Sequence, residues 1–133
     1  MERSWKLPED AVASLATLGG PWSLRGSRGI LYRSADRVAF RALGSGLRFD
    51  VPQRELGDLR YSKWIGGPSL LCRVGSRRYR IGFHQLAGLR YPDNFAAPEA
   101  DPLVRDLALA GSREELCSAW LALLGSKDTA SGH

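Results

Sequence analysis

Catalytic side chains are scarce in this sequence. His84 and His133 are its only histidines, and the second lies at the C-terminal end, so no pair of imidazoles is placed to hold a metal. Cys72 and Cys117 show no zinc-type spacing, and each is predicted to be a small buried apolar residue in a reducing compartment. A thiol nucleophile would require one of these cysteines to meet His84, and no motif supports that pairing.

Carboxylates and glycines do not complete a catalytic set either. The aspartates considered lack the spacing of an acid and base pair: Asp50, Asp58, Asp93 and Asp101. The glycines occur at turns and do not form the strand, glycine loop and helix unit that cradles a phosphate. The chain is therefore predicted to be non-enzymatic, with no cofactor and no metal.

Positive charge is the more prominent chemistry. The 133 residues include 19 Lys and Arg against 14 Asp and Glu, and the formal charge of +5 favours acidic partners such as phospholipid headgroups or nucleic acid. Arginine heavily outnumbers lysine while Ala, Gly and Leu abound. A compositional bias of the source genome is therefore an alternative explanation for some of these arginines.

Length and hydropathy fit one soluble domain. A chain of 133 residues, 44% of them hydrophobic, can bury one core. The first 20 residues contain three acidic side chains and no signal-like apolar run, and no later stretch approaches a membrane span of about 20 residues. We expect a cytoplasmic protein without a transmembrane segment, ending in a frayed tail over residues 126–133.

The N-terminal segment, residues 1–20, is predicted to carry a short helix that braces the domain. Pro8 suits a first helical turn, Gly19 suits the end, and Val12, Leu15 and Leu18 recur at intervals of three residues.

From Pro21 the apolar period changes to two, which indicates strands. In RVAFRAL, Val38 and Phe40 are expected on the inner face, with Arg37 and Arg41 on the outer face. In LRFDV the residues expected to face inward are Leu47, Phe49 and Val51. Seven strands are predicted, in the segments PWSLRG, GILYR, RVAFRAL, LRFDV, LGDLRYSKW, SLLCRV and RRYRIGF.

The last third of the chain is predicted to be irregular and then helical. Residues 86–110 form a proline-broken insertion in which DPLVRDLALAG can make a brief helix. In SREE, Ser112 and Glu115 make a capping box. The helix that follows has one apolar face, formed by Leu116, Ala119, Trp120, Leu123 and Leu124. The predicted fold is mainly β: an antiparallel barrel or sandwich over residues 21–125, with this helix against it.

Several segments resemble the GRAM-like branch of the pleckstrin-homology (PH) superfold. The opening hairpin of that branch resembles GILYRSADRVAF, and its closing hairpin resembles LLCRVGSRRYRIGF. Its next signature after the opening hairpin resembles FDVPQRELGDLRY. Trp120 stands where the family often places a helix tryptophan. The resemblance covers about residues 22–85 and 112–124. It implies a bacterial-type single-domain protein with a seven-stranded PH-like barrel capped by one amphipathic helix. The N-terminal helix and the insertion depart from the family pattern.

The resemblance implies a binding module. PH domains often hold acidic lipid headgroups between loops that carry Lys and Arg, and the equivalent loops here carry Arg25, Arg28, Arg77 and Arg78. The segment RGSRG does not reproduce the family's basic signature in the first loop, and a solvated strand face is the alternative for most of these arginines. The resulting hypothesis is an adaptor or peripheral-membrane docking domain.

Two other binding hypotheses stay open. Trp64 and Ile65 in KWIGGPSLL, and Phe95 in NFAAPEADPL, are candidate contacts for a protein partner or for a second copy of the chain, which would make a homo-oligomer. Nucleic-acid binding ranks lower, because Tyr32 and Tyr61 are expected in the core and leave the basic face without a stacking platform. The arginines expected on outward strand faces are Arg33, Arg37, Arg41, Arg48, Arg73, Arg78 and Arg80.

Overall fold

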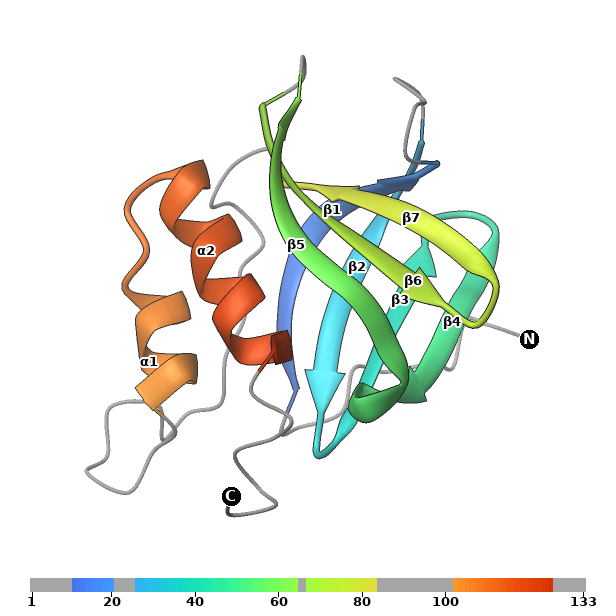
Figure 1. The fold of residues 1–133 in the computed structure, drawn as a ribbon, viewed down its shortest axis with the longest axis horizontal. Helices are drawn as coiled ribbons and strands as arrows, with labels where there is room; N and C mark the ends of the chain where they lie inside the picture. The colour runs from blue at the N-terminus through green and yellow to red at the C-terminus, as the bar shows by residue number, and fades with distance from the viewer. Residues whose placement is uncertain (1–10, 21–25, 65–66, 84–101, 126–133) are drawn as a thin grey trace.

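One antiparallel sheet and two helices make up the described part of the chain (Figure 1). The computed structural model describes residues 11–20, 26–64, 67–83 and 102–125. The strands are β1 (Val12–Gly19), β2 (Ser27–Ser34), β3 (Arg37–Ala42), β4 (Gly46–Pro52), β5 (Leu56–Trp64), β6 (Gly67–Val74) and β7 (Arg77–Gly82). A short 3-10 helix, η2 (Gln53–Glu55), joins β4 to β5, and the helices α1 (Pro102–Ala108) and α2 (Arg113–Leu124) follow the sheet. The prediction of a mainly β fold with a C-terminal helix is confirmed.

The sheet is open, so the prediction of a closed barrel is wrong. Its strand order is β4-β3-β2-β1-β7-β6-β5, and β1 lies at the centre, paired with β2 along most of its length and with β7 near its end. The edge strands β4 and β5 are consecutive in the chain but do not pair. Pro52 has no N–H to donate, and η2 turns the chain between the two edges. Figure 1 shows a strongly curved sheet with both helices on one side of it.

The predicted N-terminal helix is also wrong over the described residues, because residues 12–19 form the central strand β1. Val12, Ala16 and Leu18 join the main core, whereas Leu15 is 41% exposed on the other face. The intervals of three residues therefore arose by chance within an alternating pattern that contains several small residues. Pairing with both β2 and β7 overrides the helix propensity of this alanine-containing segment. The predicted strand PWSLRG lies almost wholly outside the described residues.

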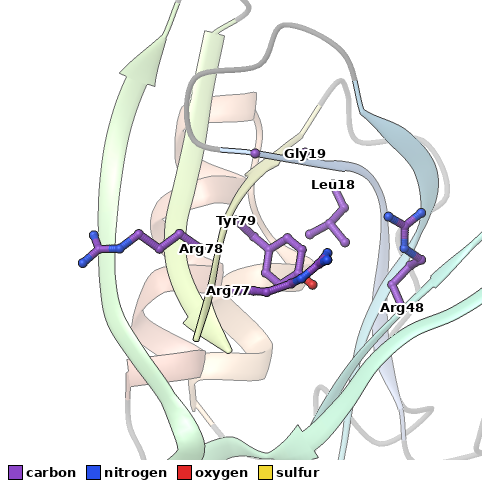
Figure 2. Close-up of a pocket in the computed structure, with 7 residues that line it drawn as sticks. Leu18, Gly19, Arg48, Arg77, Arg78 and Tyr79 are labelled. Carbon is purple, nitrogen blue, oxygen red and sulfur yellow. The ribbon is translucent and has the colours of Figure 1, made fainter. Parts of the chain in front are cut away.

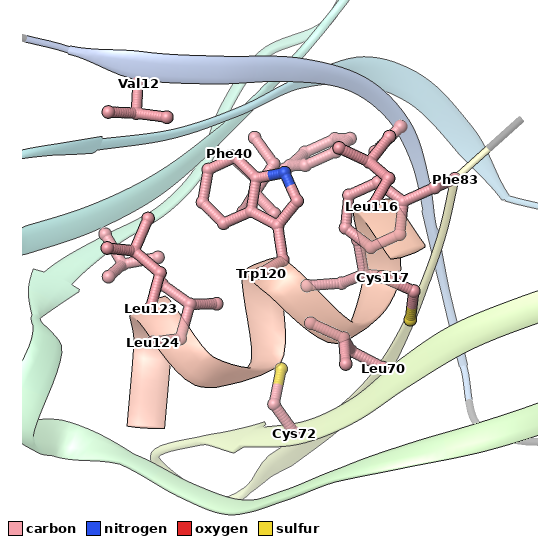
Figure 3. Packing of buried hydrophobic residues seen from close by; sticks show 14 of the residues in the cluster. Val12, Phe40, Leu70, Cys72, Phe83, Leu116, Cys117, Trp120, Leu123 and Leu124 are labelled. Atoms are coloured by element: carbon pink, nitrogen blue, oxygen red, sulfur yellow. The ribbon is translucent and has the colours of Figure 1, made fainter. Parts of the chain in front are cut away.

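The core lies between the concave face of the sheet and α2 (Figure 3). Trp120 is completely buried at its centre, stacks on Phe83 with ring centroids 6.2 Å apart, and donates its indole N–H to Ser14 Oγ at 2.9 Å. Val38 and Phe40 are completely buried, as the alternation predicts. The apolar face predicted for the C-terminal helix is buried throughout. Gly29 lets β2 approach β3, since a Cβ there would lie 2.3 Å from the Arg41 carbonyl oxygen.

Hydrogen bonds between side chains and backbone groups satisfy both ends of α2. Ser112 Oγ accepts from the Glu115 N–H at 3.1 Å, as predicted, while the Glu115 carboxylate accepts from the N–H of Gly111 at 2.6 Å. At the other end, the buried Gln53 donates its amide to the carbonyls of Leu123 and Leu124, at 2.9 and 3.0 Å. The helix is thus attached to η2, the segment that separates the two sheet edges.

Two arginines expected on outward, solvated strand faces are placed otherwise. Arg33 is half-buried and donates to Gln53 Oε1 at 3.1 Å. Arg80 is only 8% exposed and donates to Ser69 Oγ at 2.6 Å and Ser62 Oγ at 3.2 Å. Burial lowers the pKa of Arg80. These two arginines therefore contribute to the structure of the domain and are not part of a solvated basic face.

Candidate functional site

A basic cavity opens where three parts of the sheet converge, away from the two helices (Figure 2). It has a volume of about 280 Å³. Its lining residues are Leu18, Gly19 and Gly20 at the end of β1, Arg48 on β4, and Arg77, Arg78 and Tyr79 at the start of β7. Three of these seven are arginines and none is acidic. A cleft lined by one sign of charge concentrates ligands of the opposite sign.

Apolar side chains form the wall of the cavity on the core side. Leu18 is 2% exposed, and Tyr79 is partly buried and packs on Phe49 with ring centroids 5.6 Å apart. Tyr79 packs against the core on the same strand as Ile81 and also forms part of the cavity wall.

Arg48 reaches this cavity because β4 has a bulge. Phe40 pairs with Phe49, but the next residue, Arg41, pairs with Leu47, so Arg48 is an extra residue without a ladder partner. The bulge reverses the expected alternation: Arg48 lines the cavity, while Leu47, which was predicted to face inward, is 48% exposed. Arg48 Nη1 donates to Ser27 Oγ at 3.0 Å, which ties its guanidinium to the start of β2.

Arg77 enters the cavity from the opposite side to Arg48, as Figure 2 shows. It follows the two-residue turn Gly75–Ser76, in which Val74 pairs with Arg77 and Gly75 has φ 63°. A glycine with positive φ in the first central position is what a tight hairpin of this length requires. Within the described residues, no acidic side chain pairs with the exposed Arg77 guanidinium. Its charge is therefore available to a ligand.

Arg78 contributes to the cavity wall, but its charge lies elsewhere. Figure 2 shows its guanidinium directed away from the cavity. Arg78 Nη2 lies 3.6 Å from Asp58 Oδ2, and Arg73 Nη1 donates to the same oxygen at 2.9 Å. Asp58 sits in a second bulge, between Gly57 and Arg60, with φ 51°. The side chain of Arg78 is thus partly neutralised on the convex face.

The other two arginines that the resemblance suggested are close to this region in sequence. Arg28 is exposed near the start of β2, next to the Ser27 that binds Arg48, and its carbonyl accepts from the Leu43 N–H at 2.8 Å. Arg28 is not among the lining residues of the cavity. Arg25 lies outside the described residues. The structure therefore brings Arg77 together with Arg48, a residue that sequence analysis assigned to a solvated face.

The residues predicted to contact a protein partner lie wholly or partly outside the described part of the chain. Trp64 is the last residue of β5, paired with Gly67 across the hairpin, and its side chain is outside the described part of the chain. Ile65, Phe95 and His84 also lie outside the described residues. The hypothesis of a protein partner at these positions stays a prediction.

Most of the other reactive side chains that the structure describes are buried. Cys72 and Cys117 are buried free thiols, one on β6 and one on α2, and burial raises the pKa of each to about 12. The expectation that Tyr32 and Tyr61 lie in the core is wrong for the main core: Tyr32 is buried on the convex face with Ala11, Ala13 and Ala39, where burial raises its pKa, and Tyr61 is 38% exposed. Across residues 11–20, 26–64, 67–83 and 102–125, no three His, Cys, Asp or Glu residues group to hold a metal.

Comparison with known proteins leaves the family open: no protein-family model matches the chain, and no curated protein is detectably similar to it. Among the described helices, none is both long enough and apolar enough to cross a membrane. The function must therefore be argued from the cavity and its surroundings. The fold and the site together define a class of structure: an open antiparallel sheet, covered on one side by helices, with an arginine-lined cavity at the end away from the helices.

Proposed function

We propose that this chain is a non-enzymatic binding module that docks on anionic membrane surfaces, with Arg48 and Arg77 holding phosphate groups in the cavity. The observation that carries the proposal is the pair of guanidinium groups facing one cavity that no acidic side chain lines. Each guanidinium offers planar donors that match two phosphate oxygens. The Tyr79 side chain lines the same cavity.

The resemblance to the GRAM-like branch of the PH superfold supports this proposal. The order of elements, seven antiparallel strands and then a C-terminal helix that packs in the core, accords with it. So does the position of the cavity, between the end of β1 and the β6–β7 turn, the regions in which the resemblance suggested basic loops. Of the arginines that the resemblance suggested, Arg77 lines the cavity and Arg78 pairs with Asp58, so we take Arg77 and the additional Arg48 as the proposed phosphate ligands.

Vesicle co-sedimentation across a salt series tests the proposal. We expect the wild-type chain to bind vesicles of phosphatidylcholine and phosphatidylserine, and to release them as salt screens the charges. An arginine near an anionic surface contributes about 1 kcal/mol, so Arg48→Gln combined with Arg77→Gln removes about 2 kcal/mol, which weakens binding by about thirtyfold.

The matched control is Arg113→Gln. Arg113 is exposed at the start of α2 and does not line the cavity, and its substitution removes one positive charge in the same way. A control variant that loses as much affinity per charge as the cavity variant would show that net charge alone drives binding. An absence of binding at low salt would refute the membrane proposal.

A further inference from the structure

The hairpin beside the arginine cavity carries exposed leucines at its tip. Leu43, in the turn between β3 and β4, is 62% exposed, and Leu47, near the start of β4, is 48% exposed. Gly44 and Gly46 both have positive φ, and a Cβ at either position would meet nothing within 4 Å. Leucine is a costly residue to leave in solvent at the end of a glycine turn, and these two are not covered by any described segment.

The two leucines continue into a strip on the convex face of the sheet in which Arg41 is flanked by apolar side chains. In the register of the strands, Leu15 lies opposite Ile30, Ile30 opposite Arg41, and Arg41 opposite Leu47. A depression of about 440 Å³ lies along this strip, bounded by Ile30, Arg41 and the turn from Leu43 to Gly46. Leu15, at 41% exposure, ends the strip on β1.

Two arginines neighbour this apolar tip along the chain and across the strands. Leu47 is adjacent in sequence to Arg48, which lines the cavity, and the Leu43 N–H donates to the carbonyl of Arg28. The hairpin end from Arg41 to Phe49 contains no acidic residue. Leucines and arginines therefore share one end of the molecule, the end that lies away from α1 and α2 in Figure 1.

This combination fits an anionic bilayer better than a second copy of the chain. In a two-fold dimer the same patch meets itself, so Arg28, Arg41 and Arg48 would face the same arginines. At a bilayer, apolar side chains enter the boundary between headgroups and acyl chains while cations stay at the level of the phosphates. The leucines would then contact the boundary between headgroups and acyl chains, and the arginines would contact the phosphates.

We infer that the tip of the β3–β4 hairpin, with Leu43 and Leu47, inserts into the interface of an anionic membrane while the arginines of the adjacent cavity hold its phosphates. This inference rests on the proposed function and adds to it an orientation and an apolar contact: the hairpin end of the sheet meets the bilayer, and its leucines enter it. It predicts two separable contributions to binding, an apolar one from the leucines and an electrostatic one from the arginines.

Vesicle partitioning across a salt series separates the two contributions. The double variant Leu43→Ala and Leu47→Ala is expected to bind phosphatidylcholine–phosphatidylserine vesicles at least about tenfold more weakly at every salt concentration, with the same dependence on salt as the wild type. The matched control is Leu109→Ala, because Leu109 is 69% exposed after the end of α1 and should not touch the bilayer. Thermal unfolding of each variant verifies that the fold is unchanged.

Depth of insertion gives a direct second readout. A single environment-sensitive fluorophore attached through Leu43→Cys should shift to shorter wavelength on adding vesicles. The label is selective because both native cysteines, Cys72 and Cys117, are buried. The same fluorophore attached through Ser118→Cys, at an exposed position on α2, should not shift.

The outcomes distinguish the inference from the proposed function. Wild-type binding that depends on Arg48 and Arg77 but is unchanged in the leucine double variant overturns insertion and leaves the phosphate site standing. Binding of soluble inositol hexakisphosphate without binding of vesicles overturns both membrane docking and insertion, and leaves only an anion site at the cavity. Failure to bind either probe overturns both proposals, and a weakened leucine variant with a fluorescence shift at position 43 supports both.

Discussion

Gln53 is the residue whose replacement tests most directly how the helix is held on the sheet. It is 6% exposed, and its side chain makes three hydrogen bonds: two donated to the carbonyls of Leu123 and Leu124, and one accepted from Arg33. Gln53→Leu keeps the approximate volume and removes all three bonds. The last turn of α2 then loses its attachment to η2.

The expected loss follows from the partners that remain. Leu123 O also accepts from the Gly125 N–H, so it keeps one bond, and the half-buried Arg33 can turn towards water. Leu124 O loses the amide that satisfies it at the end of the helix. A lost hydrogen bond costs about 1 kcal/mol and a buried unsatisfied carbonyl about 1–3 kcal/mol, so the variant should lose about 2–4 kcal/mol of unfolding free energy.

Urea and thermal unfolding measure this loss. For a chain of this size, about 3 kcal/mol lowers Tm by roughly 10 °C. Glu55→Gln is the control, because Glu55 is exposed on the same short helix and its replacement should change the free energy by less than about 0.5 kcal/mol. A Gln53→Leu protein as stable as the wild type would refute the claim that this amide holds the end of α2.

Two further predictions concern backbone strain and buried thiols. Ala35 has φ 55° in the two-residue turn between β2 and β3, so Ala35→Gly should raise stability by about 0.5–1 kcal/mol in urea unfolding, and a loss of stability would contradict the strain argument. Burial raises the pKa of Cys72 and Cys117 from the ordinary value of 9.0 to about 12, so on raising the pH the unfolded chain loses thiol protons first. The free energy of unfolding should therefore fall between about pH 9 and pH 12, by up to about 1.4 kcal/mol per pH unit for each thiol. Replacing either cysteine by Ala should make this decline shallower, and an unchanged slope would contradict it.

The sequence was most informative where one face of a strand is buried by simple alternation. Val38 and Phe40 show this, because their neighbours on the same strand face the other way and the two buried side chains meet the core. The C-terminal helix was equally predictable: a capping box fixed its start, and its apolar face is wide and uninterrupted. In both cases the signal is local, and local signals survive folding when tertiary contacts agree with them.

Prediction failed where burial does not follow the residue type. Ser14 faces the core because the Trp120 indole donates to it, and Leu15 faces outward, so β1 lacks a clear apolar face. Ala13 is buried on the convex face as well, which removes the polar half of the alternation. Pairing with the next strand, β2, and with β7 much later in the chain decides that this segment is β-structure, and the apolar pattern of the segment itself cannot report that pairing.

The candidate site depends on a single inserted residue, and this explains why sequence analysis found only part of it. Arg77 follows the turn Gly75–Ser76, which is predictable from the sequence. The resemblance placed that turn among the basic loops. Arg48 sits in an alternating strand whose pattern predicts an outward arginine and an inward Leu47. The bulge exchanges the two: it turns the arginine to the cavity and the leucine to the surface. If the proposals hold, one bulge supplies both a phosphate ligand and an apolar anchor to the same end of the sheet. Deleting Arg48 should then restore regular pairing and remove the charge while leaving Leu47 opposite Arg41 on the convex face, whereas Arg48→Gln should remove the charge and keep the bulge.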